Sequence, residues 1–312
     1  MIEINSIHSF VPKNFISKKE LQKKIGKNKF KKIYNYTGFK KLHVLKKKQN
    51  REIFFLNAIE KFLKISKINT KKIDAVIFSS HSRKNEMPIF ASKVQANFKL
   101  RNDIIAYDLP GSCSGFTNGI IHSYAFINSG ITQNVLLICA DAHSVNLDKN
   151  LLPVVGDGLS CILIKRKKNT IIYDYGVDGL NNEMLRIESE TKKLRMDGMQ
   201  VFEFAAKRVP ETYNNILKKK KIKIDYYCFH QPNKTIHDHI IKKLNIDFNK
   251  VIKTFEYGNT SSPSIPISIC NNFPNKKILN KTFLFCGFGA GLSWSTVVSK
   301  LNNTFISKVY KI

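Results

Sequence analysis

The sequence predicts an α/β protein of two similar halves that a pseudo-twofold axis relates. Two echoes within its 312 residues indicate this duplication. Residues 72–78 read Lys-Ile-Asp followed by four apolar or aromatic residues, and residues 223–229 repeat the pattern about 150 positions later. The apolar runs 135–139 and 283–286 recur at nearly the same offset. Short apolar runs that end in polar or glycine residues are typical of strands buried in a parallel sheet.

The segments between these strands have the spacing of helices. Ala91 and Val94 in the first half, and Ile236 and Ile240 in the second, place apolar side chains three or four residues apart. We therefore expect strand and helix to alternate in both halves, which would span residues 1–165 and 166–312.

The composition is that of a globular protein with a strong positive charge. The hydrophobic content of 43% supplies a core, and the formal net charge is +29. Only seven of the 52 basic residues are arginine, which is typical of an AT-rich coding bias more than of phosphate recognition. We expect lysine runs such as 46–48 and 218–221 to be solvated surface, whose field would attract an acidic protein or a phosphorylated ligand.

Cysteine usage and hydropathy argue against several classes of protein. The six cysteines are scattered without a CxxC pair, so we expect neither a disulfide framework nor a zinc site. His237 and His239 could join His230 around a metal, but their spacing splits them between two faces of a helix, so we expect no metal. No apolar run approaches the roughly 20 residues of a membrane span, and the N-terminus lacks the order of a signal peptide. We therefore expect a cytoplasmic protein that binds neither membrane nor nucleic acid.

Cys113 is the candidate nucleophile. It lies in the segment GSCSGF at 111–116, after an apolar strand-like run and before a helical pattern that Gly130 ends. A cysteine between strand and helix has its sulfur at the positive end of the helix dipole, which lowers the pKa of a thiol and favours the nucleophilic thiolate. The alternative is a small buried hydrophobic residue, as most intracellular cysteines are.

Three further segments combine polar or small residues with predicted strands. His230 ends a strand and precedes a helix, Asn259 lies in a polar turn, and residues 287–291 form a glycine-rich loop that could bring backbone close to a ligand. Ligands of open α/β sheets gather at the carboxyl ends of strands, so these segments could share one pocket with Cys113. Taken singly, each has an ordinary alternative: a structural histidine, a turn residue and a tight turn.

Taken together, these motifs resemble 3-oxoacyl-(acyl-carrier-protein) synthase III, the initiating condensing enzyme of bacterial fatty-acid synthesis. The resemblance covers most of the chain in the family's order and spacing. Its motifs are Thr37-Gly38, GSCSGF at 111–116, VGDG at 155–158, MDGMQVFEFA at 196–205, HQPN at 230–233, GNTSSPSIP at 258–266 and GFGAGLSW at 287–294. It implies the thiolase fold, in which two similar α/β halves stack in five layers, αβαβα.

The resemblance also implies roles for the catalytic residues. Cys113 would accept an acyl group from a thioester donor and form an acyl-enzyme. A malonyl thioester would then lose carbon dioxide, and its carbanion would attack the acyl group. His230 and Asn259 would hydrogen-bond the thioester oxygen of this extender and stabilise the enolate. The backbone N–H groups of Cys113 and Ala290 would form the oxyanion hole, since Ala290 replaces the family's usual glycine but keeps its N–H.

The residues implied for substrate binding depart in part from the family's pattern, because lysine or tyrosine stands where an arginine or tryptophan is usual. Arginine and lysine are not equivalent where a planar fork is needed, so the grip on coenzyme A would change. Met87 matches the residue that reaches across a homodimer interface to line the partner's acyl pocket; the alternative is an ordinary core methionine. The implied substrate-binding set is Lys32, Tyr36, Met87, Lys149, Phe202, Lys234 and Gly289.

The sequence therefore predicts a decarboxylative condensing enzyme, an acyltransferase of fatty-acid or related acyl-chain biosynthesis. It would use coenzyme A or carrier thioesters as substrates and no cofactor, as a homodimer with an acidic acyl carrier protein as partner. The altered coenzyme-binding positions leave open a second function on the same fold, acyl transfer to an oxygen or nitrogen nucleophile without condensation, in a glycan or secondary-metabolite pathway. A basic binding protein without catalysis is the third hypothesis, based on charge alone.

Overall fold

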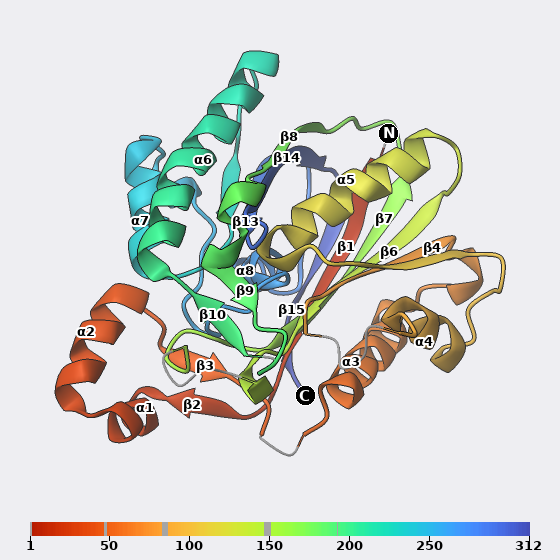
Figure 1. The fold of residues 1–312 in the computed structure, drawn as a ribbon. Coiled ribbons are helices and arrows are strands. Elements are labelled where there is room, and N and C mark those ends of the chain that lie inside the picture. The colour runs from red at the N-terminus through yellow and green to blue at the C-terminus, as the bar shows by residue number, and fades with distance from the viewer. Residues whose placement is uncertain (1, 47–48, 83–86, 147–150, 192) are drawn as a thin grey trace.

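The computed structural model describes residues 2–46, 49–82, 87–146, 151–191 and 193–312. Within these ranges two large sheets alternate with three layers of helices, as Figure 1 shows. The predicted five-layer α/β arrangement is confirmed. No helix among the described residues is long and apolar enough to span a membrane.

The first sheet is mixed and contains strands from both ends of the chain. Its strands, in spatial order, are β12 (Lys276–Ile278), β15 (Thr304–Lys311), β1 (Ile2–Val11), β7 (Gly158–Arg166), β6 (Asn134–Asp141), β4 (Ala75–Ser79) and β5 (Ile105–Leu109). The second sheet comprises β11 (Tyr226–Phe229), β13 (Lys281–Gly289), β14 (Ser293–Leu301) and β8 (Ile172–Val177). Two small pairs add β2 (Phe15–Ser17) with β3 (Lys41–His43), and β9 (Leu185–Ile187) with β10 (Leu194–Met196).

The helices divide among the middle layer, the two outer layers and the periphery (Figure 1). The middle layer contains α5 (Gly115–Asn128) and α8 (Ser264–Asn272). The first sheet is covered by α3 (Arg51–Ser66) and α4 (Phe90–Asn97), and the second by α6 (Gly198–Lys219) and α7 (Lys234–Lys243). At the periphery, α1 (Lys18–Ile25) leads into α2 (Lys27–Thr37), which packs on α7.

The pairing of strands shows the duplication directly. In the first sheet β4 runs parallel to β6, β6 antiparallel to β7, and β7 antiparallel to β1. In the second sheet β11, β13, β14 and β8 repeat these three relations in the same order. Val251 forms a parallel bridge with Tyr227 of β11. It occupies the position in the second sheet that β5, which pairs with β4, occupies in the first. The two halves are therefore equivalent in topology.

An aspartate immediately precedes the equivalent strand in each half. The backbone N–H of Asp74 donates to Asn134, and the Asp74 carboxylate accepts from the N–H of the same residue at 2.9 Å. Asp225 is bonded to Thr282 in the same two ways, with the carboxylate contact at 2.8 Å. These paired bonds fix the register at the start of two neighbouring strands, which gives the sequence echo its physical cause.

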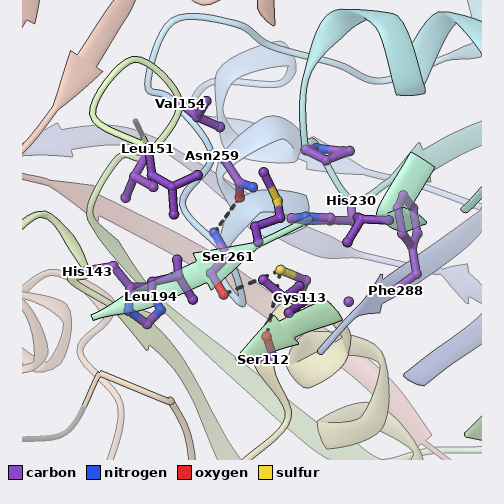
Figure 2. Close-up of a pocket in the computed structure, with 16 residues that line it drawn as sticks. Ser112, Cys113, His143, Leu151, Val154, Leu194, His230, Asn259, Ser261 and Phe288 are labelled. Atoms are coloured by element: carbon purple, nitrogen blue, oxygen red, sulfur yellow. Dashed lines mark hydrogen bonds between the residues drawn. The ribbon is translucent and has the colours of Figure 1, made fainter. Parts of the chain in front are cut away.

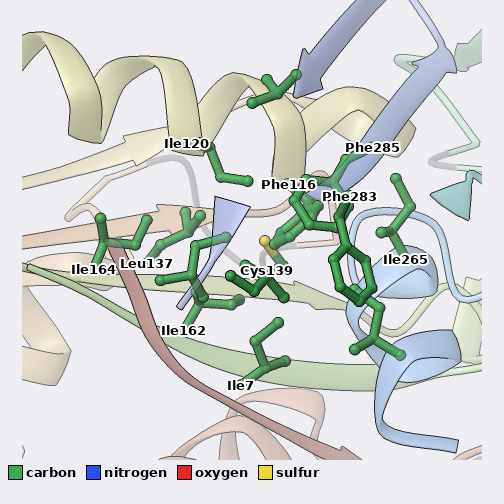
Figure 3. Packing of buried hydrophobic residues seen from close by; sticks show 14 of the residues in the cluster. Ile7, Phe116, Ile120, Leu137, Cys139, Ile162, Ile164, Ile265, Phe283 and Phe285 are labelled. Carbon is green, nitrogen blue, oxygen red and sulfur yellow. The ribbon is translucent and has the colours of Figure 1, made fainter. Parts of the chain in front are cut away.

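The middle layer explains why α5 is apolar on more than one face. A helix that is hydrophobic all round is buried, and α5 packs against strands of both sheets. Figure 3 shows Phe116 and Ile120 of this helix among side chains from both sheets, including Leu137 and Phe285. Gly119 permits the close approach, because a Cβ there would overlap the side chain of Leu137.

The chain does not separate cleanly at residue 165. The two repeats follow the predicted order, but β12 and β15 come late in the chain and extend the first sheet beside β1. The division into 1–165 and 166–312 thus stays a prediction about the order of the repeats. The helix after Cys113 and the helix starting at Lys234 are confirmed at the expected positions.

Candidate active site

Cys113 sits in a tight connection between β5 and α5. After Leu109 the chain turns through Gly111 and the short 3₁₀ segment Ser112–Ser114, and α5 follows at once. Ser112 has a φ of 45°, in the left-handed region that costs a non-glycine residue about 1 kcal/mol. Gly111 cannot carry a Cβ without approaching the Cα of Gly115 to 2.5 Å. The connection is therefore strained and close-packed, which holds the cysteine at the start of the helix.

The Cys113 thiol is almost fully enclosed. Its residue is 8% exposed, and Sγ lies 3.6 Å from Oγ of Ser261 and 3.9 Å from Oγ of Ser112. Burial raises the pKa of the Cys113 thiol to about 11 and outweighs the hydrogen bonds from these serines, which lower it. The predicted lowering of this pKa is wrong, because the low-dielectric surroundings disfavour the thiolate more than the helix terminus favours it. The resting side chain of Cys113 is therefore a neutral thiol.

His230 follows β11 and is held as a neutral imidazole. Its backbone N–H donates to Cys286 at 2.8 Å and so continues the pairing of β11 with β13. Burial lowers the pKa of the ring to about 3, and Nδ1 lies 2.7 Å from Oγ of Ser264 in α8. When the Ser264 hydroxyl donates to Nδ1, Nε2 carries the ring hydrogen and becomes a donor. The ring edge of Phe288 packs on the imidazole with centroids 5.3 Å apart.

Asn259 presents the nitrogen of its carboxamide. Its backbone N–H donates to Val154 at 2.8 Å and its carbonyl accepts from Gly156 at 2.9 Å, which fastens the turn before α8 to the segment 154–156. The side-chain Oδ1 accepts from the backbone N–H of Ser261 at 2.9 Å. Since that bond requires the oxygen to face Ser261, the NH₂ group is directed away from it and can serve as a donor.

One pocket brings these residues together. Figure 2 shows Cys113, His230 and Asn259 lining the same cavity, with Ser261 between the asparagine and the cysteine. Each lies in a different connection that leads into a helix: Cys113 before α5, His230 before α7 and Asn259 before α8, the last two in the second half. The remaining lining side chains are mostly apolar: Leu151, Val154, Val155, Leu185, Leu194, Met196, Val201, Pro232 and Phe288. The site therefore offers a thiol and two neutral hydrogen-bond donors within an apolar enclosure.

The first residues of the glycine-rich segment, up to Gly289, belong to a strand and do not form the expected loop. β13 continues through this residue, which pairs with Ser293 of β14. Glycine is required there because a Cβ would lie 2.8 Å from Cβ of Cys113 and 3.2 Å from its Sγ. Ala290 follows at the turn, and its carbonyl accepts from the Ser293 hydroxyl, which also lies 3.1 Å from Oγ of Ser114. The strand end is thus fastened to the connection that contains Cys113.

The other predicted substrate-binding residues lie apart from the lining of this cavity. Lys32 and Tyr36 are exposed on α2, whose end packs on Lys234 of α7; the Tyr36 carbonyl accepts from Thr235 at 3.0 Å. Lys234 itself is paired with Asp238 at 2.5 Å.

Phe202 and Met87 are not among the residues that line the cavity either. Phe202 packs on His239 with ring centroids 5.0 Å apart, and its neighbour Val201 lines the cavity instead. Met87 is 85% exposed, so it is not a core methionine of this chain. Lys149 lies outside the described residues.

The buried carboxylate of Asp141 links the two halves of the chain. It was not among the residues that the sequence predicted for the site. Asp141, at the end of β6, accepts from the Ser80 hydroxyl at 3.3 Å and from the N–H groups of His81 and Ser262 at 3.0 and 3.1 Å. Burial opposes its ionisation, but the neighbouring His143, followed by His81 and the hydrogen bond from Ser262, holds the pKa of Asp141 well below its usual range. Its position as the one charged residue at the end of an apolar strand was the signal that could have identified it.

Two family models match the chain. The model described as 3-oxoacyl-[acyl-carrier-protein (ACP)] synthase III matches residues 107–179, and the model of the C-terminal part of that enzyme matches residues 217–301. The first match contains Cys113, and the second contains His230 and Asn259.

Whole-chain relatives agree with these matches. A beta-ketoacyl-[acyl-carrier-protein] synthase III of Clostridium tetani is 30% identical over 96% of this chain and 98% of its own length. The crystal structure of a 3-oxoacyl-(acyl-carrier protein) synthase from Burkholderia xenovorans superposes with a TM-score of 0.94 at 22% identity, covering 100% of this chain and 97% of that one. The synthase III of Aquifex aeolicus gives a TM-score of 0.88 at 26% identity, covering 96% and 100%.

Proposed function

The chain belongs to the 3-oxoacyl-[acyl-carrier-protein] synthase III family and is an acyltransferase of this condensing type, and from this premise we propose that Cys113, His230 and Asn259 perform its reaction. The observation that carries the proposal is the single pocket in which a thiol meets two neutral donors. The mostly apolar walls suit an acyl chain, since they remove its methylene groups from water.

The first step is acyl transfer to Cys113. The sulfur attacks the thioester carbonyl, a new carbon–sulfur bond forms, the bond to the donor thiol breaks, and the thiol proton passes to that leaving group. The oxyanion of the tetrahedral intermediate would be held by the backbone N–H groups of Cys113 and Ala290. Gly289 supports this assignment, because its lack of a side chain lets the end of β13 approach the cysteine.

The second step is decarboxylative condensation. The malonyl thioester loses carbon dioxide, and its enolate oxygen accepts hydrogen bonds from Nε2 of His230 and Nδ2 of Asn259. The carbanion then attacks the acyl carbon and the bond to Cys113 breaks. The departing sulfur takes a proton from solvent, which gives a 3-oxoacyl thioester and the free enzyme. A neutral His230 suits this role because it can donate without being charged.

We place the entrance for the thioester donor beside α2 and α7. Lys32, Tyr36 and Lys234 lie on these two adjoining helices, and Pro232, just before α7, lines the pocket. An exposed aromatic ring and lysine side chains offer stacking and phosphate contacts to coenzyme A or to the phosphopantetheine arm of a carrier protein.

We also propose that the enzyme is a homodimer joined through β5. This strand is an edge of the first sheet, and all five of its residues are half-buried although most are apolar. An unpaired apolar edge invites pairing with a second copy. The exposed Met87 supports a contribution to the partner's pocket.

Separating the two steps tests the assignment. We expect Cys113→Ala to form no acyl-enzyme with any acyl thioester. Asn259→Ala should acylate normally but release carbon dioxide from malonyl-carrier protein about 10²–10³-fold more slowly, the usual cost of removing one such donor. Intact-mass spectrometry measures the first step, and trapping of labelled carbon dioxide measures the second.

Cys161→Ala is the matched control, since this cysteine is buried in the first sheet away from the pocket. Normal product formation by Cys113→Ala would end the proposal. Acylation that is never followed by carbon dioxide release would favour acyl transfer to another nucleophile.

A further inference from the structure

The pocket contains one imidazole that the condensation chemistry does not use. His143 lines the cavity together with Cys113 and His230, and Figure 2 shows it on the opposite side of the cysteine from His230, next to Leu194. Its side chain is 11% exposed. Besides the proposed catalytic residues and two serines near the sulfur, His143 is the only polar residue among the described residues that line the cavity. The others are apolar residues or glycine.

The backbone on both sides of His143 is fixed by buried groups. The N–H of Ala142 donates to the Ser82 hydroxyl at 2.8 Å, and the N–H of Ser144 donates to Asp157 at 3.0 Å. Asp157 is fully buried and also accepts from the N–H of Leu45 at 2.8 Å and from the Ser144 hydroxyl. His143 is therefore presented to the pocket by a rigid segment, as a group that recognises a ligand must be.

The two ring nitrogens of His143 differ in their contacts with the described residues. Nε2 lies 3.5 Å from Oδ1 of the buried Asp141. For Nδ1 the structure gives no hydrogen-bond partner among the described residues. The carboxylate of Asp141 accepts only, so it holds the Nε2 hydrogen and leaves Nδ1 for a ligand. An imidazole against leucine and valine side chains loses hydration, and a polar group on the ligand would restore a hydrogen bond.

We propose that His143 selects an acyl group that carries a hydroxyl. A hydroxyl donates to Nδ1 of a neutral imidazole and accepts from Nδ1–H of a protonated one, so it satisfies His143 in either state, whereas an alkyl chain leaves the nitrogen unpaired. The apolar neighbours Leu151, Val154 and Leu194 hold the methylene part of the same chain. This proposal rests on the proposed role of Cys113 as the acylated residue, and it names the class of the acyl group.

Paired thioesters test this selection. Butyryl- and hexanoyl-coenzyme A would be compared with 3-hydroxybutyryl-, 3-hydroxyhexanoyl- and 5-hydroxyhexanoyl-coenzyme A, and the rate of acylation of Cys113 followed by intact-mass spectrometry. We expect at least one hydroxylated thioester to react about 10-fold faster than its unsubstituted counterpart, the ratio that one net hydrogen bond provides. In His143→Leu that ratio should fall to about 1.

His143→Gln is the matched variant, since its amide keeps a hydrogen-bonding group at this position and should retain part of the preference. Acylation of His143→Leu by butyryl-coenzyme A shows that the variant is folded. The proposal is overturned if unsubstituted thioesters react as fast as their hydroxylated counterparts in the wild type, or if the ratio is unchanged in His143→Leu. If no thioester acylates Cys113, the proposed function fails together with it; if unsubstituted chains alone react, only the selection by His143 fails.

Discussion

Burial acts on Cys113 and His230 in the same direction, toward the neutral form. It raises the pKa of the thiol to about 11 and lowers that of the imidazole to about 3. At neutral pH the pocket therefore contains a thiol and an uncharged ring, and not a thiolate–imidazolium pair. A neutral ring is an appropriate donor to an enolate, and a neutral thiol limits side reactions of the free enzyme.

The pKa of Cys113 predicts how its reactivity depends on pH. The thiol is neutral below its pKa and nucleophilic above it, so only about one molecule in 10⁴ carries the thiolate at pH 7. We expect alkylation of the free enzyme by iodoacetamide to accelerate about tenfold for each pH unit between 7 and 10. Intact-mass spectrometry gives the rate.

Cys113→Ala identifies the reacting residue, because the other five cysteines are at most 1% exposed. A rate that already levels off near neutral pH would show that the helix terminus dominates over burial after all.

Among the elements, the segment 154–157 just before β7 depends on close backbone packing. A Cβ on Gly156 would overlap the carbonyl oxygen of Tyr257, and Gly258, with a φ of 80°, lies against Gly156 in turn. These glycines bring the two loops together so that Gly156 can donate to Asn259. The position of the candidate carboxamide thus follows from two residues without side chains.

Gly156→Ala should destabilise the fold at this contact. Because the obstructing atom is backbone and cannot rotate away, we expect the free energy of unfolding to fall by about 1–3 kcal/mol, the usual cost of overpacking. Urea denaturation followed by circular dichroism measures it. Gly179→Ala is the control, since a Cβ there meets nothing within 4 Å. Equal stability of the two variants would contradict the role assigned to Gly156.

The sequence predicted the elements better than the chemistry of their side chains. Strand ends and helix starts were readable around Cys113 and His230, because apolar runs and helical spacing are local. The sequence does not show which side of α6 faces the pocket. The predicted substrate-binding residue was therefore Phe202, although Val201 lines the cavity. The glycine segment was read as a loop, because composition does not show that Gly289 must let a strand end approach the cysteine.

Long-range contacts were the least predictable part of the site. Asp141 accepts hydrogen bonds from segments that lie about 60 and about 120 residues away in the chain, so no local pattern indicates its surroundings. His143 has no motif of its own, and its place in the pocket depends on the long-range bonds that anchor its neighbours Ala142 and Ser144. The pKa of Cys113 was predicted in the wrong direction for the same reason, since burial is a property of the whole fold.

On the scale of the whole molecule, the net charge of +29 predicts how the enzyme meets an acidic carrier protein. Salt screens such attraction with a Debye length of about 8 Å at physiological ionic strength. We expect the KM for malonyl-carrier protein to rise roughly tenfold between low and 0.3 M ionic strength. Initial rates of condensation at several salt concentrations measure it.

A malonyl thioester of N-acetylcysteamine serves as the control, because it lacks the acidic surface of the carrier. Its KM should change little. An equal rise for both substrates would remove electrostatic attraction as the recruiting force.

β15 lies beside β1 in the first sheet, between β1 and the edge strand β12, and Ser6 is paired there with Phe305. A ribosome therefore makes one of these neighbours at the beginning of translation and the other close to its end. Until β15 has been synthesised, β1 has no partner strand on that side, although β7 can pair with its other side much earlier. Premature termination ahead of residue 304 would leave this border open to foreign strands and to aggregation, so quality control of such fragments becomes part of making the enzyme.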